Sequence, residues 1–344
     1  MRILQLMAGG AQGGAELFFE RLTMALARRG MAQQLAIREN AARADRLRDA
    51  GLLVSELPFG GKLDCRTRFA LRRQIADFDP DIVLSWMSRA SDKLPGKDAG
   101  ARPVYCARLG GYYPLKYYRK CDHLIGNTPD IVDYLVHEGW PEDKAHYLPN
   151  FVSAEMAPPL RRDLFSTPEK APLLLAMGRL HRNKAFDVLL TALAALPDCF
   201  LWLAGDGPEK QPLQEQAHSL GVSERVRFLG WREDGAALCA TADIFVCPSR
   251  IEPLGNVVIE AWAQRLPVVA ARAAGPEFLI TDEEDGLLAR LEDASDLARA
   301  IRRLVDDPVF AKNIAERGYG SYVSQFTEDV VVDRYLQFFA KVVV

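Results

Sequence analysis

The sequence predicts an α/β protein built from two domains, each containing an open and mostly parallel sheet. Three observations predict this fold class. Short apolar runs alternate with segments of helical period from one end of the chain to the other. A proline-rich stretch without periodicity divides the chain near its middle. The length of 344 residues is too great for one ordinary domain and suits two.

Composition excludes several classes of protein. Apolar residues make up 49% and charged residues 26% of the chain, which excludes a disordered or collagen-like protein. No apolar stretch reaches the roughly 18 residues that a membrane helix needs, and Gln5 interrupts the first apolar run, which makes a poor signal peptide. The six cysteines lie far apart, which supports neither a zinc site nor a disulfide scaffold. We therefore expect a soluble cytoplasmic protein, and with a net charge of −3 we expect no nucleic acid partner.

In the first domain, predicted to span residues 1–160, apolar runs alternate with helical segments. Residues 15–29 have helical period and place Leu17, Leu22 and Leu26 near one face. Because helices separate the runs, the strands are predicted to pair in parallel as βαβ units. The predicted strands are residues 3–7, 34–37, 82–86, 104–107, 123–126 and 146–148.

The second domain, predicted to span residues 173–325, repeats this scheme. Residues 161–172, with Pro168 and Pro172, have no periodicity and are predicted to be a linker. The last segment, residues 326–344, is predicted to be a helix with enough apolar surface to pack on a neighbour. Two open sheets joined this way are expected to face each other across a cleft, with ligands at the carboxyl ends of the strands. The predicted strands are residues 173–177, 200–203, 225–228, 244–247, 268–270 and 287–289.

The strongest candidate site follows the fourth predicted strand of the second domain, at residues 248–256. A loop with proline and glycine leads there into a helix that begins near Gly255 or Asn256, and the N–H groups at such a start attract an anion. Glu252 precedes this helix and Glu260 lies inside it. The pattern suits a sugar nucleotide, because amides would bind the diphosphate while the carboxylates accept hydrogen bonds from sugar hydroxyls. A capped helix with solvated glutamates remains the alternative from these residues alone.

Two further loops carry candidate ligand contacts. Gly178, Arg179 and Lys184 follow the first strand of the second domain, where a guanidinium and an ammonium group would reach a diphosphate; an ordinary basic loop is the alternative. The glycine-rich loop at residues 9–16 lacks G-x-G-x-x-G, so the dinucleotide fingerprint is absent, although its glycines allow close approach of the backbone to a ligand. Residues 205–207 (Gly-Asp-Gly) are interpreted as a turn between strand and helix.

Two acidic clusters contain enough carboxylates for a metal site. Their positions in the predicted fold argue against one. Asp77, Asp79 and Asp81 precede a predicted strand and therefore lie at the edge of the sheet away from the expected ligand. Residues 282–285 likewise form a predicted turn before a strand. Zinc-protease, serine-hydrolase, P-loop and EF-hand motifs are missing from the sequence. We therefore expect no metal and no cofactor other than a co-substrate.

Glu252 and Glu260, with seven residues between them, resemble the E-x7-E signature of the retaining glycosyltransferases of family 4. The similarity spans essentially the whole chain and is densest from about residue 173 to 305. It implies the GT-B fold, in which two Rossmann-like parallel-sheet domains face each other across a cleft and a C-terminal helix crosses back to the N-terminal domain. Other matching stretches are residues 13–16, 80–83, 178–184, 203–207, 226–230, 242–243, 274–277 and 285–288.

The resemblance also implies roles for individual residues. Arg179 and Lys184 would neutralise the donor diphosphate as it leaves, and together with Glu252 they are interpreted as catalytic. Glu252 would hold the transferred sugar, and Glu260 the ribose. Because these cations and a helix terminus supply positive charge where the leaving phosphate gains negative charge, the reaction is expected to need no metal. Further donor-binding positions implied by the resemblance are Gly14, Gly178, Leu254, Gly255 and Asn256.

The sequence departs from the family pattern in the first domain. Many relatives carry a histidine there that touches the donor sugar, whereas this chain has no histidine before His123. Arg108 and Ser85 are candidate replacements. Phe151 stands in a motif where relatives often have glycine, and it is expected to stiffen the turn between the domains.

The acceptor is expected on the first domain, where cations and tyrosines gather between residues 112 and 120. Such residues favour lipid head groups, and a solvated helix face is the alternative. The hypothesis is transfer of a sugar from a nucleotide-diphosphate sugar to a glycan or glycolipid, such as a lipopolysaccharide core, by a protein held at the cytosolic face of an anionic inner membrane. A catalytically silent GT-B binding subunit and a sugar-nucleotide 2-epimerase are the alternatives. The acceptor-side candidates are Arg108, Tyr112, Tyr113 and Lys116.

Overall fold

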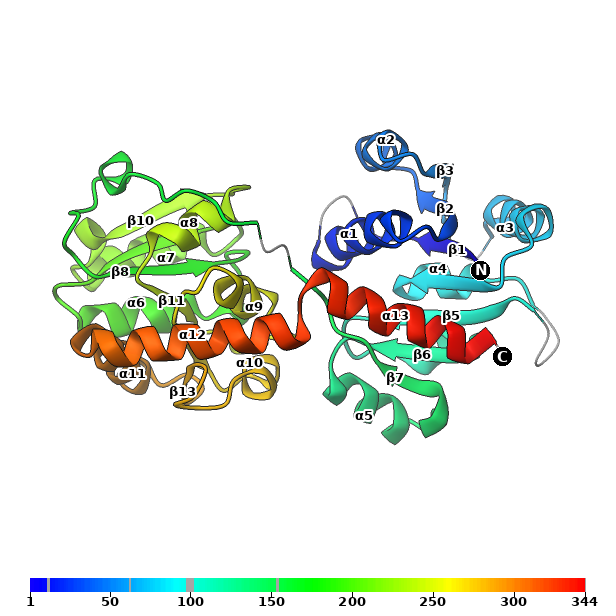
Figure 1. The fold of residues 1–344 in the computed structure, drawn as a ribbon. Coiled ribbons are helices and arrows are strands. Elements are labelled where there is room, and N and C mark those ends of the chain that lie inside the picture. Colours follow the sequence, from blue (N-terminus) through cyan, green and yellow to red (C-terminus); the bar gives the residue numbers. More distant parts are fainter. Residues whose placement is uncertain (11–12, 62, 97–101, 153–154, 344) are drawn as a thin grey trace. The chain divides into compact units, whose positions relative to one another are not determined.

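The structure, a computed structural model, describes residues 1–10, 13–61, 63–96, 102–152 and 155–343, which form two compact units (Figure 1). Unit 1 comprises Met1–Phe151 together with the C-terminal segment from Glu328, and unit 2 comprises Val152–Thr327. Each unit contains a parallel sheet between helices, so the predicted α/β class with two Rossmann-like domains is confirmed.

Unit 1 contains a seven-stranded sheet with the order β3-β2-β1-β4-β5-β6-β7, in which all neighbours pair in parallel. Its strands are β1 (Arg2–Met7), β2 (Ala32–Arg38), β3 (Leu53–Leu57), β4 (Ile82–Trp86), β5 (Val104–Leu109), β6 (His123–Gly126) and β7 (Ala145–Tyr147). Its helices are α1 (Gly14–Arg28), α2 (Ala41–Asp49), α3 (Cys65–Phe78), α4 (Met87–Lys93), η1 (Leu115–Tyr117), α5 (Pro129–His137), η2 (Glu142–Lys144) and α13 (Glu328–Val343).

Unit 2 contains a six-stranded parallel sheet with the order β10-β9-β8-β11-β12-β13. Its strands are β8 (Leu173–Met177), β9 (Phe200–Ala204), β10 (Val226–Gly230), β11 (Ile244–Cys247), β12 (Val268–Ala271) and β13 (Leu287–Ala289). Its helices are η3 (Arg162–Phe165), η4 (Arg182–Lys184), α6 (Phe186–Ala194), α7 (Lys210–Ser219), η5 (Ser223–Arg225), α8 (Gly235–Thr241), α9 (Asn256–Ala263), α10 (Ala274–Leu279), α11 (Ala294–Asp306) and α12 (Pro308–Gln325).

The proline-rich stretch belongs to unit 2, although residues 161–172 were expected to link two domains divided at residue 160. The Arg162 guanidinium donates to the carbonyl oxygen of Thr241 at 2.8 Å, and the Phe165 ring lies 5.0 Å from the Trp202 ring in an edge-on contact. Thr167 accepts a hydrogen bond from the Trp202 indole at 2.9 Å. These contacts tie the stretch to unit 2, and the chain passes between the units at Phe151 and again at Thr327.

The strand β3 is an element that the apolar pattern did not predict. It is the edge strand of its sheet, and Leu53 at its start is 67% exposed. An edge strand with little buried surface needs no apolar run, so it leaves a weak trace in the sequence.

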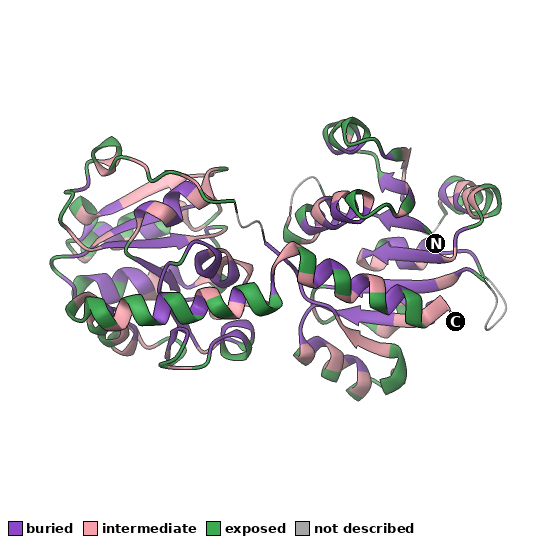
Figure 2. Ribbon diagram, viewed as in Figure 1, coloured by how far each residue is buried: buried purple, intermediate pink, exposed green. Residues whose placement is uncertain are grey.

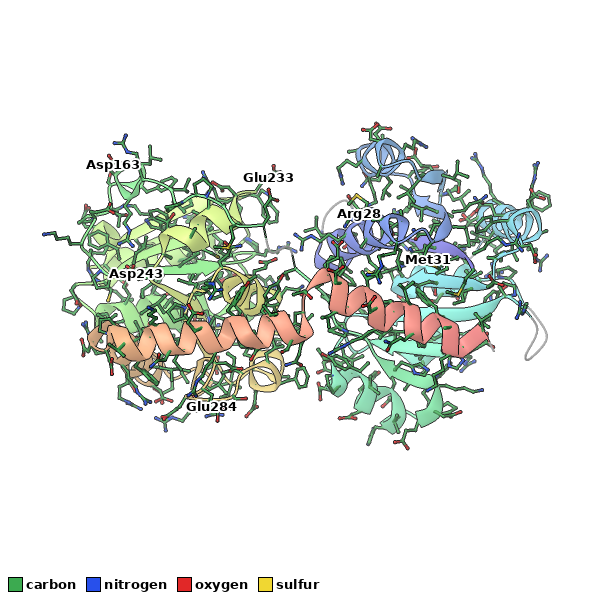
Figure 3. All side chains as sticks on the ribbon, viewed as in Figure 1. Arg28, Met31, Asp163, Glu233, Asp243 and Glu284 are labelled. Carbon is green, nitrogen blue, oxygen red and sulfur yellow. The ribbon has the colours of Figure 1, made fainter. Side chains whose placement is uncertain are left out.

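Helix α13 supplies part of the core of unit 1. Its residues Val331, Tyr335 and Phe339 are fully buried, and they pack in one apolar cluster with Phe18 and Trp86. Figure 2 shows the contrast between this buried side of α13 and its exposed side. At the end of α1, the Arg28 side chain, labelled in Figure 3, forms an ion pair of 2.5 Å with Glu328.

The strand order of unit 2 reverses direction between β8 and β11. Chains leaving the carboxyl ends of these two neighbouring parallel strands emerge at one edge of the sheet, which is the usual ligand position in open α/β sheets. None of the helices in the described part of the chain is long and apolar enough to span a membrane.

Candidate functional site

The loop after β8 is built on glycines that let two backbones touch. Gly178 has a φ of 148° and donates its N–H to the carbonyl oxygen of Ala204 at 2.9 Å. Gly205, with a φ of 149°, lies so close to Gly178 that any side chain there would collide with the Gly178 carbonyl group. Leu180 donates its N–H to Asp206 at 3.0 Å. The Gly-Asp-Gly turn after β9 therefore supports the loop that carries the predicted cations.

Lys184 ends the short helix η4 and is held against the glycine loop. Its Cε lies 3.4 Å from where a Cβ at Gly178 would stand, so a larger residue at Gly178 would crowd the lysine. The Lys184 ammonium group forms an ion pair with the Glu252 carboxylate. Burial alone would lower the pKa of Lys184, but the charges of Glu252 and Glu260 contribute to raising it above its ordinary value. Lys184 is therefore held in its charged form by the carboxylates near it.

Glu252 is held by two hydrogen bonds besides that ion pair. Its side chain is 11% exposed, and it accepts a hydrogen bond from the Ser249 hydroxyl at 3.2 Å. Its carbonyl oxygen accepts the N–H of Gly275, at the start of α10, at 2.8 Å. A Cβ at Gly275 would lie 2.6 Å from the Leu254 carbonyl carbon, so only glycine fits beneath this loop. The loop before α9 is thus seated on the first turn of α10.

Helix α9 begins without a side-chain cap. Its N-cap is Gly255, with a φ of 83°, which has no side chain to accept a hydrogen bond from the first turn. In unit 2, α6, α7, α8 and α10 also begin without a side-chain cap, whereas α11 and α12 are capped by Asp293 and Asp307. The start of α9 thus presents its partial positive charge without a protein carboxylate at the cap.

The structure brings three of the predicted site residues together: Glu252 pairs with Lys184, and the charge of Glu260 also acts on that lysine. Leu254 is buried, whereas Asn256 forms the first residue of α9. Arg179 follows Gly178 in the same loop, but its side chain is exposed and takes no part in the Lys184–Glu252 ion pair.

Two residues that the sequence analysis did not single out tie this site together. Arg250 forms a two-pronged ion pair with Asp187, with Nη1–Oδ1 and Nη2–Oδ2 distances of 2.8 and 2.6 Å. Arg250 stands within the predicted motif at residues 248–256 and Asp187 follows Lys184 by three residues, but nothing in the sequence pairs them, because they lie 63 positions apart.

Gly14, the donor-binding candidate in unit 1, is the first residue of α1. The neighbouring glycines make room for a side chain of the protein itself: Glu16 accepts the N–H of Gly10 at 2.7 Å, and a Cβ at Gly9 or Gly13 would collide with the Glu16 carboxylate. Residues 11 and 12 of the predicted loop lie outside the described residues.

Arg108, a candidate replacement for the family histidine, is 3% exposed. Its Nε donates to the Tyr335 hydroxyl at 2.9 Å, and its guanidinium carbon lies 4.6 Å from the centre of the Phe18 ring. Ser85 is also buried and donates to the carbonyl oxygen of Cys106 at 3.1 Å. These contacts place both side chains in the core of unit 1, beneath α13 in the case of Arg108.

The tyrosine-rich segment is only partly exposed. Tyr112 and Tyr113 are 48% and 36% exposed, and Lys116 is exposed with its ammonium group 5.0 Å from the Tyr117 ring. Tyr118, by contrast, is fully buried. The acceptor-side candidates therefore divide between surface and core.

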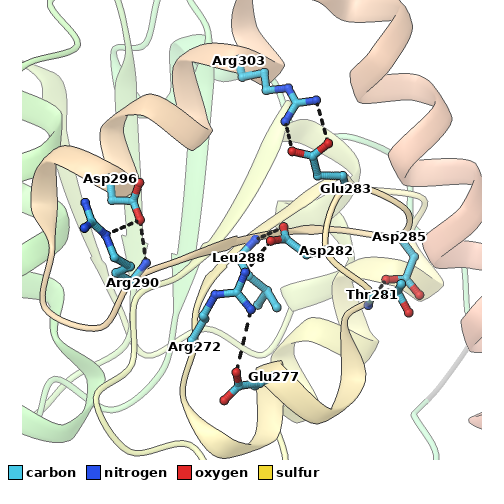
Figure 4. Close-up of polar contacts among 10 residues, drawn as sticks. All are labelled: Arg272, Glu277, Thr281, Asp282, Glu283, Asp285, Leu288, Arg290, Asp296 and Arg303. Carbon is cyan, nitrogen blue, oxygen red and sulfur yellow. Dashed lines mark hydrogen bonds and ion pairs between the residues drawn. The ribbon is translucent and has the colours of Figure 1, made fainter.

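Both acidic clusters are engaged in contacts that define turns. Asp81 accepts the backbone N–H of Arg2 at 2.8 Å, at the amino end of β4. Figure 4 shows the second cluster, in which Asp282 accepts the N–H of Leu288 at 2.9 Å and Asp285 accepts the N–H of Thr281 at 2.8 Å. Among the described residues, no group of three or more histidine, cysteine, aspartate or glutamate side chains could hold a metal ion.

A hollow of about 460 Å³ lies on unit 2, away from these residues. Pro172 and Ile244, at the amino ends of β8 and β11, contribute to its lining. The predicted site residues follow the carboxyl ends of the same strands, so the hollow and the candidate site lie at opposite edges of the sheet.

Comparison with known families gives matches along most of the chain. Residues 12–156 match a family described as Glycosyltransferase Family 4, and residues 161–321 match one described as Glycosyl transferases group 1. The division between the two matches falls close to the division between the units.

Relatives and solved structures agree with these matches. The chain is 38% identical over 341 residues to the lipopolysaccharide core biosynthesis glycosyltransferase LpsE of Rhizobium meliloti (strain 1021), covering 96% of this chain and 97% of the relative. It is 36% identical over 335 residues to LpsD of the same strain, covering 96% of each chain. Anabaena Alr3699/HepE, solved with UDP and glucose, shares the fold with a TM-score of 0.84 at 21% identity, over 99% of this chain and 100% of that one. Two matched family regions, full-length relatives and a shared two-sheet architecture establish that this chain belongs to the family 4 glycosyltransferases of GT-B fold.

Proposed function

We propose that the protein is a retaining glycosyltransferase that takes its sugar from a nucleoside-diphosphate donor bound to unit 2. The observation that carries this proposal is the grouping of Lys184, Glu252 and Glu260 beside the uncapped start of α9. Cation, amides and carboxylates in one place match a ligand with a diphosphate between two polyols. The complexes of HepE with UDP and with UDP-glucose support a donor of this kind.

The proposed mechanism follows from where charge develops. Breaking the bond between the sugar and the diphosphate leaves negative charge on the departing phosphate oxygen, while the anomeric carbon becomes cation-like. Lys184 and the start of α9 would stabilise that negative charge, and each such preorganised donor lowers the activation barrier by on the order of 3 kcal/mol. Arg179 is exposed beside them and would contact the same diphosphate.

Glu252 is proposed to exchange partners when the donor binds. Its carboxylate is paired with Lys184, so a diphosphate that takes the lysine would leave Glu252 to accept hydrogen bonds from the sugar hydroxyls. The acceptor oxygen would attack the anomeric carbon on the face that the phosphate leaves, and the acceptor proton would pass to the departing phosphate oxygen. This route retains the anomeric configuration and requires neither a protein base nor a metal.

We propose a membrane-bound glycolipid, of the kind that forms a lipopolysaccharide core, as the acceptor. The names of LpsE and LpsD support this substrate class. In unit 1, α3 and the turn before it carry a surface that suits anionic lipid: Leu63 in the turn and Phe69 on the helix are 94% and 73% exposed. Around them stand four exposed arginines, which we name the α3 basic face: Arg66, Arg68, Arg72 and Arg73.

The α3 basic face extends toward the predicted acceptor segment. Burial lowers the pKa of Lys120, and repulsion by Arg68 lowers it further, which shows that the two cations are near each other. Among the described residues, Arg73 alone of the four arginines has an acidic partner, Asp77 at 3.3 Å. An unbalanced cationic surface with exposed apolar side chains favours a lipid head-group region at the cytosolic face of a membrane.

The proposal is tested by incubating the protein with a panel of nucleotide sugars and a lipopolysaccharide-core acceptor. We expect release of nucleoside diphosphate only when donor and acceptor are both present, a product with the anomeric configuration of the donor, and unchanged turnover after chelation of divalent metals. Lys184→Ala should lower kcat about 100- to 1000-fold, whereas Arg182→Ala, an exposed neighbour, should not. Donor binding without release would indicate a silent binding subunit, and conversion of the donor to its C2 epimer, with no acceptor and no net release of nucleotide, would indicate an epimerase.

A further inference from the structure

The loops after β8 and β11 carry Lys184 and Glu252, and Arg250 joins these loops in addition to the Lys184–Glu252 ion pair. Arg250 lies two residues before Glu252, and Asp187 lies three residues after Lys184, in the first turn of α6. The guanidinium of Arg250 grips both carboxylate oxygens of Asp187, at 2.8 and 2.6 Å. A planar guanidinium bound in this two-pronged way fixes orientation as well as distance.

The contact is reinforced along the backbone. Nη1 of Arg250 also donates to the carbonyl oxygen of Arg182 at 2.8 Å, and the backbone N–H of Arg250 donates to the carbonyl oxygen of Asn183 at 2.8 Å. Nε of Arg250 pairs with Glu292, in the turn after β13. The guanidinium is thus aimed at protein acceptors on three segments, which is the arrangement of a brace and not of a ligand contact.

The guanidinium end of the brace is partly buried. The Arg250 side chain is 21% exposed and the Asp187 side chain is 45% exposed, so solvent screens this ion pair only in part. Burial alone would raise the pKa of Asp187, but its hydrogen bonds with Arg250 lower the pKa below the ordinary value. Asp187 is therefore held as a carboxylate by the same guanidinium that it orients.

We infer that Arg250 is a positioning residue, which sets the separation of Lys184 from Glu252 by clamping η4 and the start of α6 to the loop before α9. The inference rests on the proposed function, because its consequence is a rate of sugar transfer. Displacement of a reacting group by about 1 Å can lower a rate about 100-fold. Loss of the brace should therefore lower kcat without removing any group that contacts the donor.

The test compares Arg250→Met with a matched control, Arg302→Met. Arg302 forms an equally two-pronged ion pair with Asp198 in unit 2, and its side chain is 32% exposed, but it lies on α11, outside the loops of the site. We expect Arg250→Met to lower kcat about 10- to 100-fold with a smaller change in the KM for the donor, and Arg250→Lys to restore part of the loss. Arg302→Met should keep the wild-type kcat.

A double-mutant cycle separates positioning from a general loss of structure. If Arg250 acts through Lys184, then adding Arg250→Met to Lys184→Ala should lower kcat by less than threefold, because the group that it positions is already absent. Hydrogen exchange should show faster exchange of backbone amides at residues 180–187 and 248–255 in Arg250→Met, with no change there in Arg302→Met.

The outcomes distinguish this inference from the proposal on which it rests. A wild-type protein that releases no nucleotide with any donor would overturn the proposed function, whatever the exchange data show. An active wild type whose Arg250→Met variant keeps the full kcat would overturn the positioning role. Fully multiplicative losses in the cycle would also overturn it, since they would mean that Arg250 acts independently of Lys184.

Discussion

At the scale of residues, the candidate site shows which side chains a sequence can reveal. Glu252 and Glu260 were predictable because they stand at a fixed spacing around a helix start, and Lys184 because it follows a buried strand. Arg250 was not predictable as a brace, since its partner Asp187 is distant in sequence and becomes a neighbour only when β8 and β11 pair. Local patterns identify candidate ligand-binding groups, whereas the residues that hold those groups in place depend on tertiary contacts.

The pair His123 and His146 is a second residue-scale feature. Their ring nitrogens lie 3.0 Å apart on β6 and β7, and the centre of the Phe338 ring on α13 lies 4.8 Å from that of His146. Burial lowers the pKa of His146 to about 4, aided by repulsion from His123 and from Lys341 on α13. Burial also lowers the pKa of His123, so protonation of either histidine is disfavoured in the folded protein.

This pair makes the stability of unit 1 depend on pH. Between pH 6.5, the ordinary pKa, and about 4, the unfolded state binds a proton at His146 that the folded state does not. Stability is therefore greatest above that range and falls as pH decreases through it, by about 1 kcal/mol after allowing for partial exposure. Hydrogen exchange of the β6 and β7 amides across this pH range should show this loss of stability. In His146→Gln the stability should depend less steeply on pH. The exposed His218→Gln is the control, and an equal slope in both variants would contradict the assignment.

At the scale of elements, the seat of the α9 loop on α10 has a measurable consequence. A Cβ at Gly275 would lie 2.6 Å from the backbone of Leu254, so Gly275→Ala must displace the loop that carries Glu252. We expect a loss of about 1–3 kcal/mol in unfolding free energy, together with lower kcat. Gly320→Ala on α12 is the matched control, because nothing lies within 4 Å of its Cβ position and alanine should stabilise the helix by about 0.5–1 kcal/mol. A Gly275→Ala protein as stable and active as wild type would show that the seat is not tight.

Helix α3 provides the other element-scale expectation. The triple variant Arg66→Gln, Arg68→Gln and Arg72→Gln should lose retention on vesicles containing phosphatidylglycerol at low salt, since each cation near such a surface contributes about 1 kcal/mol. Removing three exposed cations from unit 2, by Arg299→Gln, Lys312→Gln and Arg317→Gln, is the control for net charge. Co-sedimentation measures both. Equal retention of the two triple variants would reject the α3 basic face as the lipid surface, and binding to neutral phosphatidylcholine would reject the electrostatic account.

At the scale of the whole molecule, the alternation of apolar runs and helical segments was sufficient for the fold class and for nearly every strand. The sequence was insufficient for the domain boundary near residue 160. A proline-rich composition indicates that regular secondary structure is absent, but it does not indicate that the stretch is unpacked. Trp202 accounts for the difference, since its ring and indole N–H engage the stretch that was expected to be a linker. Contacts with a distant buried side chain cannot be read from local composition.

The position of α13 has a consequence for how the protein is made. The helix follows all of unit 2 in the chain, yet its aromatic side chains complete the core of unit 1. On the ribosome, all residues of unit 2 are therefore synthesised before unit 1 is complete. Until α13 is made, Phe18 and Trp86 of unit 1 lack the side chains that cover them. Synthesis order and completion order are reversed, and a nascent chain stalled before α13 should recruit chaperones through that unfinished surface.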